Sequence, residues 1–307
     1  MYVSPKSWAL RTLSLEMGEA LNRRGADISF LSVNDAGREG AIKFFMVYDH
    51  LASYININGQ TSLGSTVLYF THFEERVYRM RPALKRLKKI LVMSEHDIPQ
   101  LLAMGLSEGQ IRHFPFGASD QNFNITQVQK EYDFIFSVGF RSDRSYEDRK
   151  NYIRLISVIK ELSARGGTVA IMGPGWGQIG VLKNCPKIHL IECDYSDYVK
   201  HYSKAKIFVS LSNYEGGPLP VLESLLCGIP AVITNTGFAP QLWKKSTENS
   251  LKIMTLLPAN VTEQEAVFAC LEALKSSFSS PEEIRDFGRN YSFDRAADVI
   301  LSKVLRD

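Results

Sequence analysis

The sequence predicts an α/β fold made of two halves, each built on a parallel β-sheet. Three observations predict it. Helix and strand patterns alternate along the chain, and its 307 residues are enough for two domains of ordinary size. The segment 207–234 reads as strand, loop, helix and strand, the crossover that joins neighbouring parallel strands. A hydrophobic content of 45% and a charged content of 22% are typical of a soluble globular protein.

The first half begins with an amphipathic helix over residues 7–24, whose apolar side chains recur at helical spacing and which ends at Gly25. The elements expected after it are strands over 28–31, 42–48 and 67–71, a basic helix over 76–89, a strand over 89–94 and a helix over 95–104. A connector over 111–124, containing Pro115 and Gly117, then leads to the second half. We therefore expect the two domains to divide near 120–130.

The second half repeats the alternation. The elements expected in it are strands over 132–139, 168–172, 207–212 and 231–234, with a helix over 150–165 and another between the last two strands. That last helix has proline near its start, stops at Gly228 and is followed by Pro230, which is the usual punctuation of helix ends.

Glu215 and Glu223, which are separated by seven residues, stand at the start of this helix and are the most informative feature of the chain. Parallel sheets bind ligands beyond the carboxyl ends of their strands, which is where these glutamates fall. Gly216 and Gly217 let a ligand approach the backbone, and the N–H groups that follow suit an anion. Because carboxylates accept hydrogen bonds from hydroxyls, the pattern fits a nucleotide sugar. The alternative is a Gly-Pro turn flanked by solvated glutamates.

The run from Ser212 to Glu223, with Cys227-Gly228-Ile229-Pro230 after it, resembles the signature of retaining GT-B glycosyltransferases (glycosyl transferases group 1). The segments 91–117, 136–141 and 172–175 are similar to the same family in the same order. The resemblance implies two Rossmann-like domains whose parallel sheets face a central cleft. It places an acceptor-side domain at 1–124, a nucleotide-sugar-binding domain at 125–285, and a C-terminal helix at 286–307 that packs back on the first domain.

The resemblance also implies roles for individual residues. Glu215 would contact the donor sugar and Glu223 would hold the ribose, while His72, after the strand 67–71, would face the donor sugar from the first domain. We expect the remaining contacts to the nucleotide at Gly216, Gly217, Pro218, Leu219, Pro220, Gly173 and Tyr195. For His72, the alternative is a satisfied structural histidine.

Arg141 and Lys150 are the cations closest to the family pattern, and they would neutralise the leaving diphosphate. The loop between them is longer and more charged than that pattern, so Arg144 or Arg149 can stand in for Lys150; a solvated charged loop is the alternative. We expect no metal, because the sequence has no Asp-x-Asp motif. The four cysteines show no metal-ligand spacing and read as reduced thiols of a cytosolic protein.

The chain departs from the family at residues 4–8, where many members have a glycine-rich loop and this sequence has none. Either Lys6 and Ser7 replace the contacts of that loop, or the second domain holds the donor. The acceptor side is therefore the least predictable part of the chain.

The basic segment 76–89 interleaves cations with apolar residues, and we expect it to lie on an anionic membrane surface; the alternative is a solvated helix face. A formal net charge of +3 gives no support for nucleic-acid binding. The start of the chain is not a secretory signal, and no apolar run approaches about 18 residues. These features predict a cytoplasmic protein, peripheral on the inner face of the membrane.

Together the sequence predicts a retaining, metal-independent hexosyltransferase that uses a UDP or GDP type of nucleotide diphosphate sugar. The expected acceptor is a glycan or a lipid-linked molecule in bacterial polysaccharide or glycolipid synthesis. Two alternatives stay open: a non-catalytic sugar-nucleotide-binding partner of another transferase, and a GT-B enzyme with a small soluble acceptor.

Overall fold

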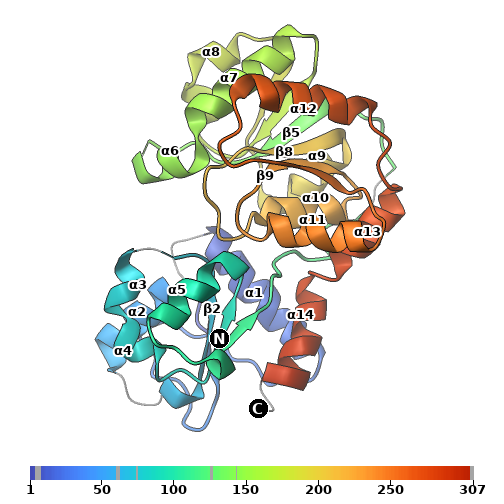
Figure 1. Ribbon diagram of the computed structural model, residues 1–307. Coiled ribbons are helices and arrows are strands. Elements are labelled where there is room, and N and C mark those ends of the chain that lie inside the picture. Colours follow the sequence, from blue (N-terminus) through green and yellow to red (C-terminus); the bar gives the residue numbers. More distant parts are fainter. Residues whose placement is uncertain (4–7, 60–62, 74, 125–126, 143, 305–307) are drawn as a thin grey trace. The chain divides into compact units, whose positions relative to one another are not determined.

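The computed structural model describes residues 1–3, 8–59, 63–73, 75–124, 127–142 and 144–304 (Figure 1). The chain forms two compact units, each with its own sheet. Unit 1 comprises Met1–Gly117 and Tyr291–Asp307, and unit 2 comprises Ala118–Asn290. In the part of the chain that is described, no helix has the length and apolar character needed to cross a membrane.

Unit 1 contains a four-stranded parallel sheet of order β1-β2-β3-β4. Its strands are β1 (Lys43–Phe45), β2 (Thr66–Phe70), β3 (Lys89–Val92) and β4 (Ile111–His113). The strand predicted over 28–31 is wrong: only Leu31 forms an isolated bridge, to Tyr2, because this segment is partly exposed and has no buried face. The strand predicted over 42–48 ends at Phe45, and β4 lies in the segment predicted as a connector.

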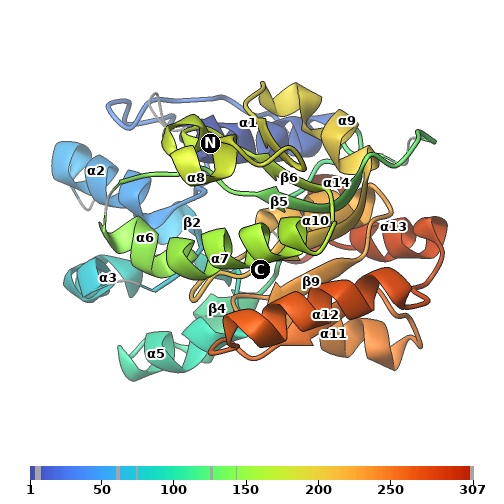
Figure 2. The same ribbon diagram turned by 90° about the horizontal axis from the view of Figure 1, so that it is seen from above.

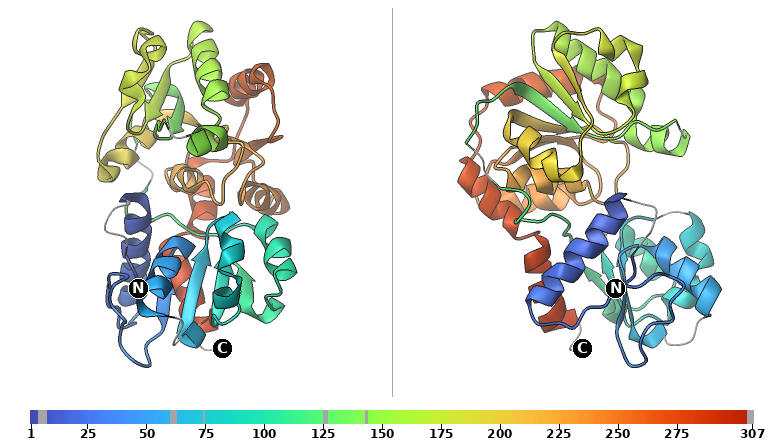
Figure 3. Two further views of the ribbon diagram at one scale, coloured as in Figure 1. Left: turned by 90° about the vertical axis from the view of Figure 1, so that its left-hand side faces the viewer. Right: turned by 180° about the vertical axis from the view of Figure 1, so that it is seen from behind.

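The helices of unit 1 alternate with its strands, and one more comes from the C-terminal segment. They are α1 (Trp8–Arg23), α2 (Tyr48–Asn58), α3 (Glu75–Arg79), α4 (Arg81–Leu84), α5 (Ile98–Ala103) and α14 (Phe293–Val299), which continues as a π-helical turn to Val304. Helices α1 and α14 lie side by side (Figure 3). Arg24 joins them through ion pairs with Asp294 at 2.6 Å and Asp298 at 2.5 Å.

The single basic helix predicted over 76–89 is wrong. The segment forms two short helices, α3 and α4, that are separated at Met80. Pro82 stands in the first turn of α4, the position where a helix tolerates proline and where a longer helix would be interrupted. Val77, Leu84 and Leu87 are buried in the core of unit 1, and of the large apolar side chains of this segment Tyr78 alone is exposed.

Unit 2 contains a six-stranded parallel sheet of order β10-β9-β8-β5-β6-β7. Its strands are β5 (Tyr132–Ser137), β6 (Val169–Met172), β7 (Ile188–Ile191), β8 (Ala205–Ser210), β9 (Ala231–Thr234) and β10 (Met254–Leu257). The order reverses between β5 and β8, as in a Rossmann sheet, and such a reversal opens a crevice beyond the strand ends. The predicted α/β class with parallel sheets is confirmed in both units.

Helices cover both faces of the unit 2 sheet. They are α6 (Arg144–Lys150), α7 (Tyr152–Ala164), α8 (Gly180–Lys183), α9 (Tyr198–Ser203), α10 (Leu219–Leu226), α11 (Ala239–Glu248), α12 (Glu263–Lys275) and α13 (Pro281–Arg289). Figure 2 shows α7 and α12 side by side, and their apolar faces share one core with β5, β6 and β8. The helix predicted over 150–165 is present as α7, which begins at Tyr152. The segment before it, predicted as a loop, forms α6, and Asn151 in a left-handed conformation (φ 52°) separates the two helices.

The boundary between the units lies between Phe116, which packs in unit 1, and Phe123, which packs in unit 2. Phe116 stacks on Tyr69 of β2 at 4.2 Å between ring centroids, and the Tyr69 hydroxyl donates to the Phe116 carbonyl. Phe123 packs instead against Tyr195 and Tyr202 of unit 2. The units therefore divide after Gly117 and after Asn290, whereas the sequence predicts limits at 124 and 285.

Candidate functional site

The candidate site lies at the carboxyl edge of the unit 2 sheet. β8 ends at Ser210, and the loop after it carries Glu215. β5, its neighbour at the reversal of strand order, leads through α6 to Arg149 and Lys150. Ligands of open α/β sheets bind at this point, because the loops after the two strands diverge there.

Glu215 is a buried carboxylate held by two cations. It is 5% exposed. Its Oε1 accepts hydrogen bonds from Lys150 Nζ and, at 2.7 Å, from the Ser212 hydroxyl, and Arg149 Nη1 lies 3.2 Å from Oε2. Burial alone would raise the pKa of Glu215, but the charges of Lys150 and Arg149 outweigh it and the pKa is lowered. Glu215 is therefore an anion at neutral pH.

The junction between α6 and α7 brings these cations to Glu215. The backbone N–H groups of Asn213 and Tyr214 donate to the Arg149 carbonyl at 2.9 and 3.3 Å. The Asn151 side chain donates to Asn213 Oδ1 at 3.0 Å, and its own oxygen accepts from the backbone N–H of Arg154 at the start of α7. Asn is one of the few residues that adopt a left-handed conformation at low cost, so Asn151 both separates the helices and fixes the loop.

Glu223 has a different environment. It lies on α10, is 5% exposed, and accepts hydrogen bonds from two phenols, Tyr195 to Oε1 at 2.7 Å and Tyr202 to Oε2 at 2.9 Å. Burial raises the pKa of Glu223 to about 7, although both phenols lower it. Tyr195 follows β7, and the structure thus brings two predicted nucleotide contacts, Tyr195 and Glu223, into direct contact.

The start of α10 offers fewer backbone donors than the sequence suggests. Pro218 and Pro220 have no N–H group, while those of Leu219 and Val221 donate to Gly217 and Pro218. Our expectation of a general anion site at this helix start is therefore wrong. The backbone N–H groups of Gly216 and Gly217 donate to no residue that the structure describes, and they are the donors that the loop can offer to a ligand.

Two glycines fit the loops of the site together. A Cβ on Gly173 would lie 2.6 Å from the Val138 carbonyl oxygen, so Gly173 allows the turn after β6 to pack on the loop after β5. A Cβ on Gly237 would lie 2.6 Å from the Gly216 carbonyl oxygen. Gly237 therefore allows the loop that carries Glu215 to pack closely against it. Our sequence analysis missed this role, although a glycine just after the strand 231–234 indicates a close approach at the edge of the sheet.

Our sequence analysis also missed Tyr202 and Ser212. Both residues lie in ordinary helix and strand-end patterns, and nothing in their spacing points to a carboxylate. Tyr202 lies near the end of α9, the helix that follows β7, and it reaches Glu223 only in the folded sheet. Ser212 reaches Glu215 only through the turn after β8.

Arg141 lies at the same sheet edge, where its side chain is exposed, whereas the described ion pairs of Glu215 are those with Arg149 and Lys150. The loop around it is fixed by Tyr152, whose hydroxyl accepts from the Arg141 backbone N–H at 3.0 Å and donates to the Gly139 carbonyl at 2.6 Å. The structure thus brings Arg149 and Lys150 together with Glu215. The side chain of Arg144, and residues 4–7 with Lys6 and Ser7, lie outside the described part of the chain.

His72 belongs to unit 1, where it follows the carboxyl end of β2. It is partly buried, its Nδ1 lies 3.0 Å from the Thr71 hydroxyl, and its ring packs edge-on against Tyr48 at 5.8 Å. In the described part of the chain no cluster of His, Cys, Asp or Glu side chains has the geometry of a metal site. The role of His72 stays a prediction.

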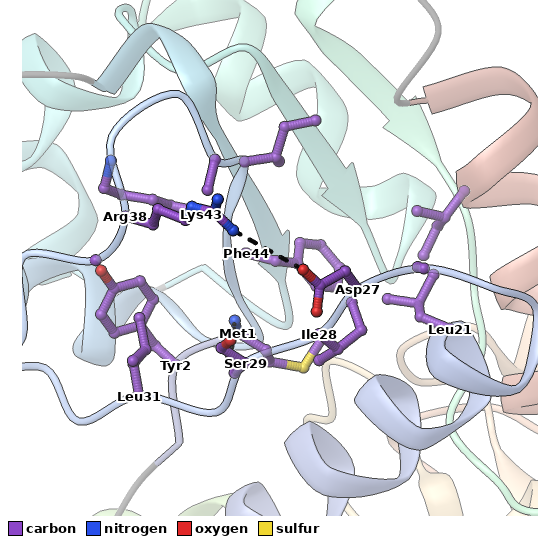
Figure 4. Close-up of a pocket in the computed structure, with 15 residues that line it drawn as sticks. Met1, Tyr2, Leu21, Asp27, Ile28, Ser29, Leu31, Arg38, Lys43 and Phe44 are labelled. Carbon is purple, nitrogen blue, oxygen red and sulfur yellow. Dashed lines mark hydrogen bonds and ion pairs between the residues drawn. The ribbon is translucent and has the colours of Figure 1, made fainter.

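A cavity of about 360 Å³ lies elsewhere in unit 1, around Tyr2, Leu31, Lys43 and Phe44 (Figure 4). Lys43 is the first residue of β1 and pairs in register with Thr66, the first residue of β2. The cavity is therefore at the amino end of these strands, whereas His72 follows the carboxyl end of β2. None of the predicted site residues lines it.

Comparison with known proteins supports both the motif and the fold. Residues 119–252 match the family model described as glycosyl transferases group 1, and this match contains Glu215 and Glu223. The resemblance that the motif indicated is thereby confirmed. No curated protein sequence matches the chain.

Solved structures match over nearly the whole chain. Sucrose-phosphate synthase from Thermosynechococcus elongatus is 15% identical, with 99% of this chain and 94% of that chain covered and a TM-score of 0.64. The lipopolysaccharide outer core galactosyltransferase WaaB is 12% identical, with 98% of each chain covered and a TM-score of 0.63. WaaG, a glycosyltransferase involved in lipopolysaccharide biosynthesis, is 13% identical, with coverage of 99% and 94% and a TM-score of 0.60. At these identities the likeness establishes the GT-B fold.

Proposed function

Starting from a chain with the GT-B fold and a group 1 glycosyltransferase segment, we propose that it transfers a hexose from a nucleotide diphosphate sugar with retention of configuration. The observation that carries the proposal is the group of Glu215, Arg149 and Lys150 at the reversal of strand order. Two cations and one carboxylate leave one positive charge, which attracts an anionic diphosphate to a buried carboxylate. The donor is of the UDP or GDP type.

In the donor complex, the two cations bind the diphosphate and the Glu215 carboxylate binds the sugar. The diphosphate competes with Glu215 for Arg149 and Lys150, and charge-assisted hydrogen bonds from both cations stabilise it as it leaves. Glu215, which accepts only, turns to the hydroxyls of the sugar. The N–H groups of Gly216 and Gly217 and the exposed Arg141 complete the donor contacts of unit 2.

Retention follows from same-face attack, with the departing phosphate taking the proton of the acceptor hydroxyl. The Ser212 hydroxyl, which donates to Glu215 Oε1, keeps the carboxylate in place for the sugar hydroxyls while the diphosphate binds Lys150 and Arg149. The acceptor is a glycan or a lipid-linked molecule, in keeping with the lipopolysaccharide enzymes among the structural neighbours. The measurement is the anomeric configuration of the product by NMR; an inverted product would overturn this part.

The test of the donor class is a panel of UDP, GDP, TDP and ADP sugars, read by thermal shift and then by donor hydrolysis. We expect one base to raise Tm clearly above the others and its sugar to be hydrolysed. A chain that no sugar nucleotide stabilises would overturn the proposal. Stabilisation without hydrolysis or transfer would instead favour a non-catalytic sugar-nucleotide-binding partner.

We assign the neutralisation of the diphosphate to side-chain cations, and chelation tests this assignment. Activity should survive EDTA, because Arg149 and Lys150 meet the charge. Complete loss on chelation, restored by Mn²⁺ or Mg²⁺, would contradict it. Lys150→Met should remove activity, and Lys160→Met, an exposed lysine of α7, is the matched control.

Membrane contact is the second part of the proposal, and it rests on exposed cations of the segment 76–89. Arg79, Arg81, Lys85 and Arg86 are exposed, whereas Val77, Leu84 and Leu87 are buried, so attraction to lipid is mainly electrostatic. Anionic vesicles should bind the protein at low salt and release it at high salt. Replacing these four residues by Gln should abolish binding and leave donor hydrolysis intact. If the unaltered protein ignores the vesicles, a small soluble acceptor is favoured.

A further inference from the structure

Glu223 differs from Glu215, the other buried carboxylate of the site, because its described neighbours offer O–H groups rather than cations. Both of its oxygens accept from phenols, and no described residue forms an ion pair with it. A buried carboxylate of this kind repels a phosphate and favours additional hydroxyl donors. Its two oxygens have about four lone-pair sites, of which the phenols occupy two.

The two phenols are not equivalent. Tyr202 lies on α9, is fully buried, and also forms a side-chain hydrogen bond with Ser137 at the end of β5. Tyr195 lies in the short 3₁₀ turn after β7, is only partly buried, and packs edge-on against Phe123. The hydrogen bond from Tyr202 to Glu223 is thus supported by Ser137 of β5. Tyr195, in contrast, reaches Glu223 from a turn at the edge of the sheet.

We propose that Tyr202 is a positioning residue that aims the Glu223 carboxylate at a vicinal diol, the ribose of the donor, and that Tyr195 is the partner which the ribose displaces. The inference rests on the proposed function, because it takes a ribonucleotide as the ligand. It makes the 2′-hydroxyl a specificity determinant. A diol can donate to both oxygens only while Tyr202 holds the carboxylate in place, and the Tyr195 site on Oε1 is the one that opens.

The experiment compares a ribonucleoside diphosphate with its 2′-deoxy form. The probe is UDP or GDP, whichever stabilises the unaltered protein more, and its dissociation constant is measured by calorimetry. We expect the unaltered protein to bind the ribose form at least about 10-fold more tightly, which corresponds to about 1.4 kcal/mol. Tyr202→Phe should reduce this ratio to about 2 or less. Tyr195→Phe should leave the ratio within about 2-fold of its original value.

The ratio separates positioning from a purely structural role. A loss of packing would lower Tm and weaken both nucleotides alike, and the ratio would stay unchanged. Tyr132→Phe is the matched control, since Tyr132 is also buried in unit 2 and its hydroxyl does not contact Glu223. If Tyr202→Phe does not fold, Ser137→Ala decides the question, because it removes the group behind Tyr202; we expect the ratio to fall, though by less.

The outcomes distinguish the two proposals. Failure of UDP and of GDP to bind the unaltered protein would refute the proposed function. Binding with a ratio that Tyr202→Phe or, in its place, Ser137→Ala leaves intact would refute this inference alone. A ratio that falls with Tyr195→Phe but not with Tyr202→Phe would reverse the assigned roles and also count against it.

Discussion

Glu215 and Glu223 belong to one loop and helix and are equally buried, yet the fold treats them in opposite ways. Glu215 meets Lys150 and Arg149, and its pKa is lowered. Glu223 meets Tyr195 and Tyr202, and burial raises its pKa to about 7. The burial is shared, so the partners decide the difference: ammonium and guanidinium groups compensate a buried charge, and phenols do so only in part.

This difference teaches why two similar glutamates suit different parts of one ligand. Glu215 forms ion pairs with two cations that can also bind an anionic ligand. Glu223 forms no described ion pair, and its oxygens can accept further hydrogen bonds from hydroxyl groups. Charge therefore sorts the ligand, with the diphosphate toward the first glutamate and the ribose toward the second.

The largest expected effect comes from Glu215→Ala. Turnover should fall 10²- to 10³-fold, about 2.7–4 kcal/mol, because the sugar loses its buried acceptor. Affinity for the free nucleoside diphosphate should stay unchanged or improve, since Arg149 and Lys150 lose their competing partner. The measurements are kcat and the nucleotide Kd, with Glu161→Ala, an exposed glutamate of α7, as the control. Equal loss of nucleotide affinity in Glu215→Ala and Glu223→Ala would show that their roles are misassigned.

Glu223→Gln should stabilise the protein in a pH-dependent way. The folded pKa of about 7 is above the ordinary value of 4.5. Below pH 4.5 both states are protonated and burial has no ionic cost; between 4.5 and 7 the unfolded state alone loses its proton, so stability falls as pH rises. The variant avoids this cost, and its advantage in the free energy of unfolding should reach roughly 3 kcal/mol at most above pH 7.

The measurement is urea unfolding of both proteins at pH 5, 7 and 8.5. Glu215→Gln is the opposite case, because the folded pKa of Glu215 is lowered. Its stabilisation is present above the unfolded pKa and is lost as pH falls, so the variant should be less stable at pH 7 and above. A pH-independent difference for Glu223→Gln would contradict the assignment of its raised pKa.

Above pH 7, where Glu223 is ionised, Glu223→Ala should weaken binding of the nucleotide by about 1.5–3 kcal/mol, because the ribose hydroxyls lose a charged acceptor. The buried phenols of Tyr195 and Tyr202 lose their acceptor as well, so Tm is recorded beside the Kd. Affinity for inorganic diphosphate should not change. If diphosphate and nucleotide weaken equally, Glu223 acts on the whole site rather than on the ribose.

The fold class was predictable because alternation and chain punctuation are local. The motif likewise lies within a single segment, so Glu215 and Glu223 could be located by spacing alone. The partners of these residues could not, since Arg149 is 66 residues from Glu215 and Tyr202 is 21 residues from Glu223. Such contacts arise from strand order, which a single sequence does not specify.

The errors have similar causes. Helical periodicity over 76–89 outweighed Pro82, whose position inside the pattern signals an interruption. The strand predicted over 28–31 has the right residues, but only Leu31 pairs with another segment, through a single bridge to Tyr2. The segment before Asn151, predicted as a charged loop, forms α6, which ends where Asn151 adopts a left-handed conformation and contacts Asn213, a residue of a distant loop.

The smallest expected effect concerns Asn151, at the junction of α6 and α7. It tests the backbone geometry that brings the two cations to Glu215 and not to Glu223. Asn151→Gly keeps a backbone that adopts φ 52° easily but removes the hydrogen bonds to Asn213 and to the start of α7. Loss of the cap to glycine costs only a few tenths of a kcal/mol, so Tm should change little. Turnover should nevertheless fall about 3- to 10-fold, because Lys150 and Arg149 are held less well against Glu215.

Ser250→Gly is the matched control, since Ser250 is also left-handed (φ 57°) and lies after α11, away from both glutamates; its turnover should stay unchanged. Nucleoside diphosphate affinity should fall in Asn151→Gly as well, because the same two cations bind the diphosphate. Equal turnover in the two variants would mean that the loop of Glu215 does not need this junction, and the contrast between the two glutamates would then rest on side-chain charge alone.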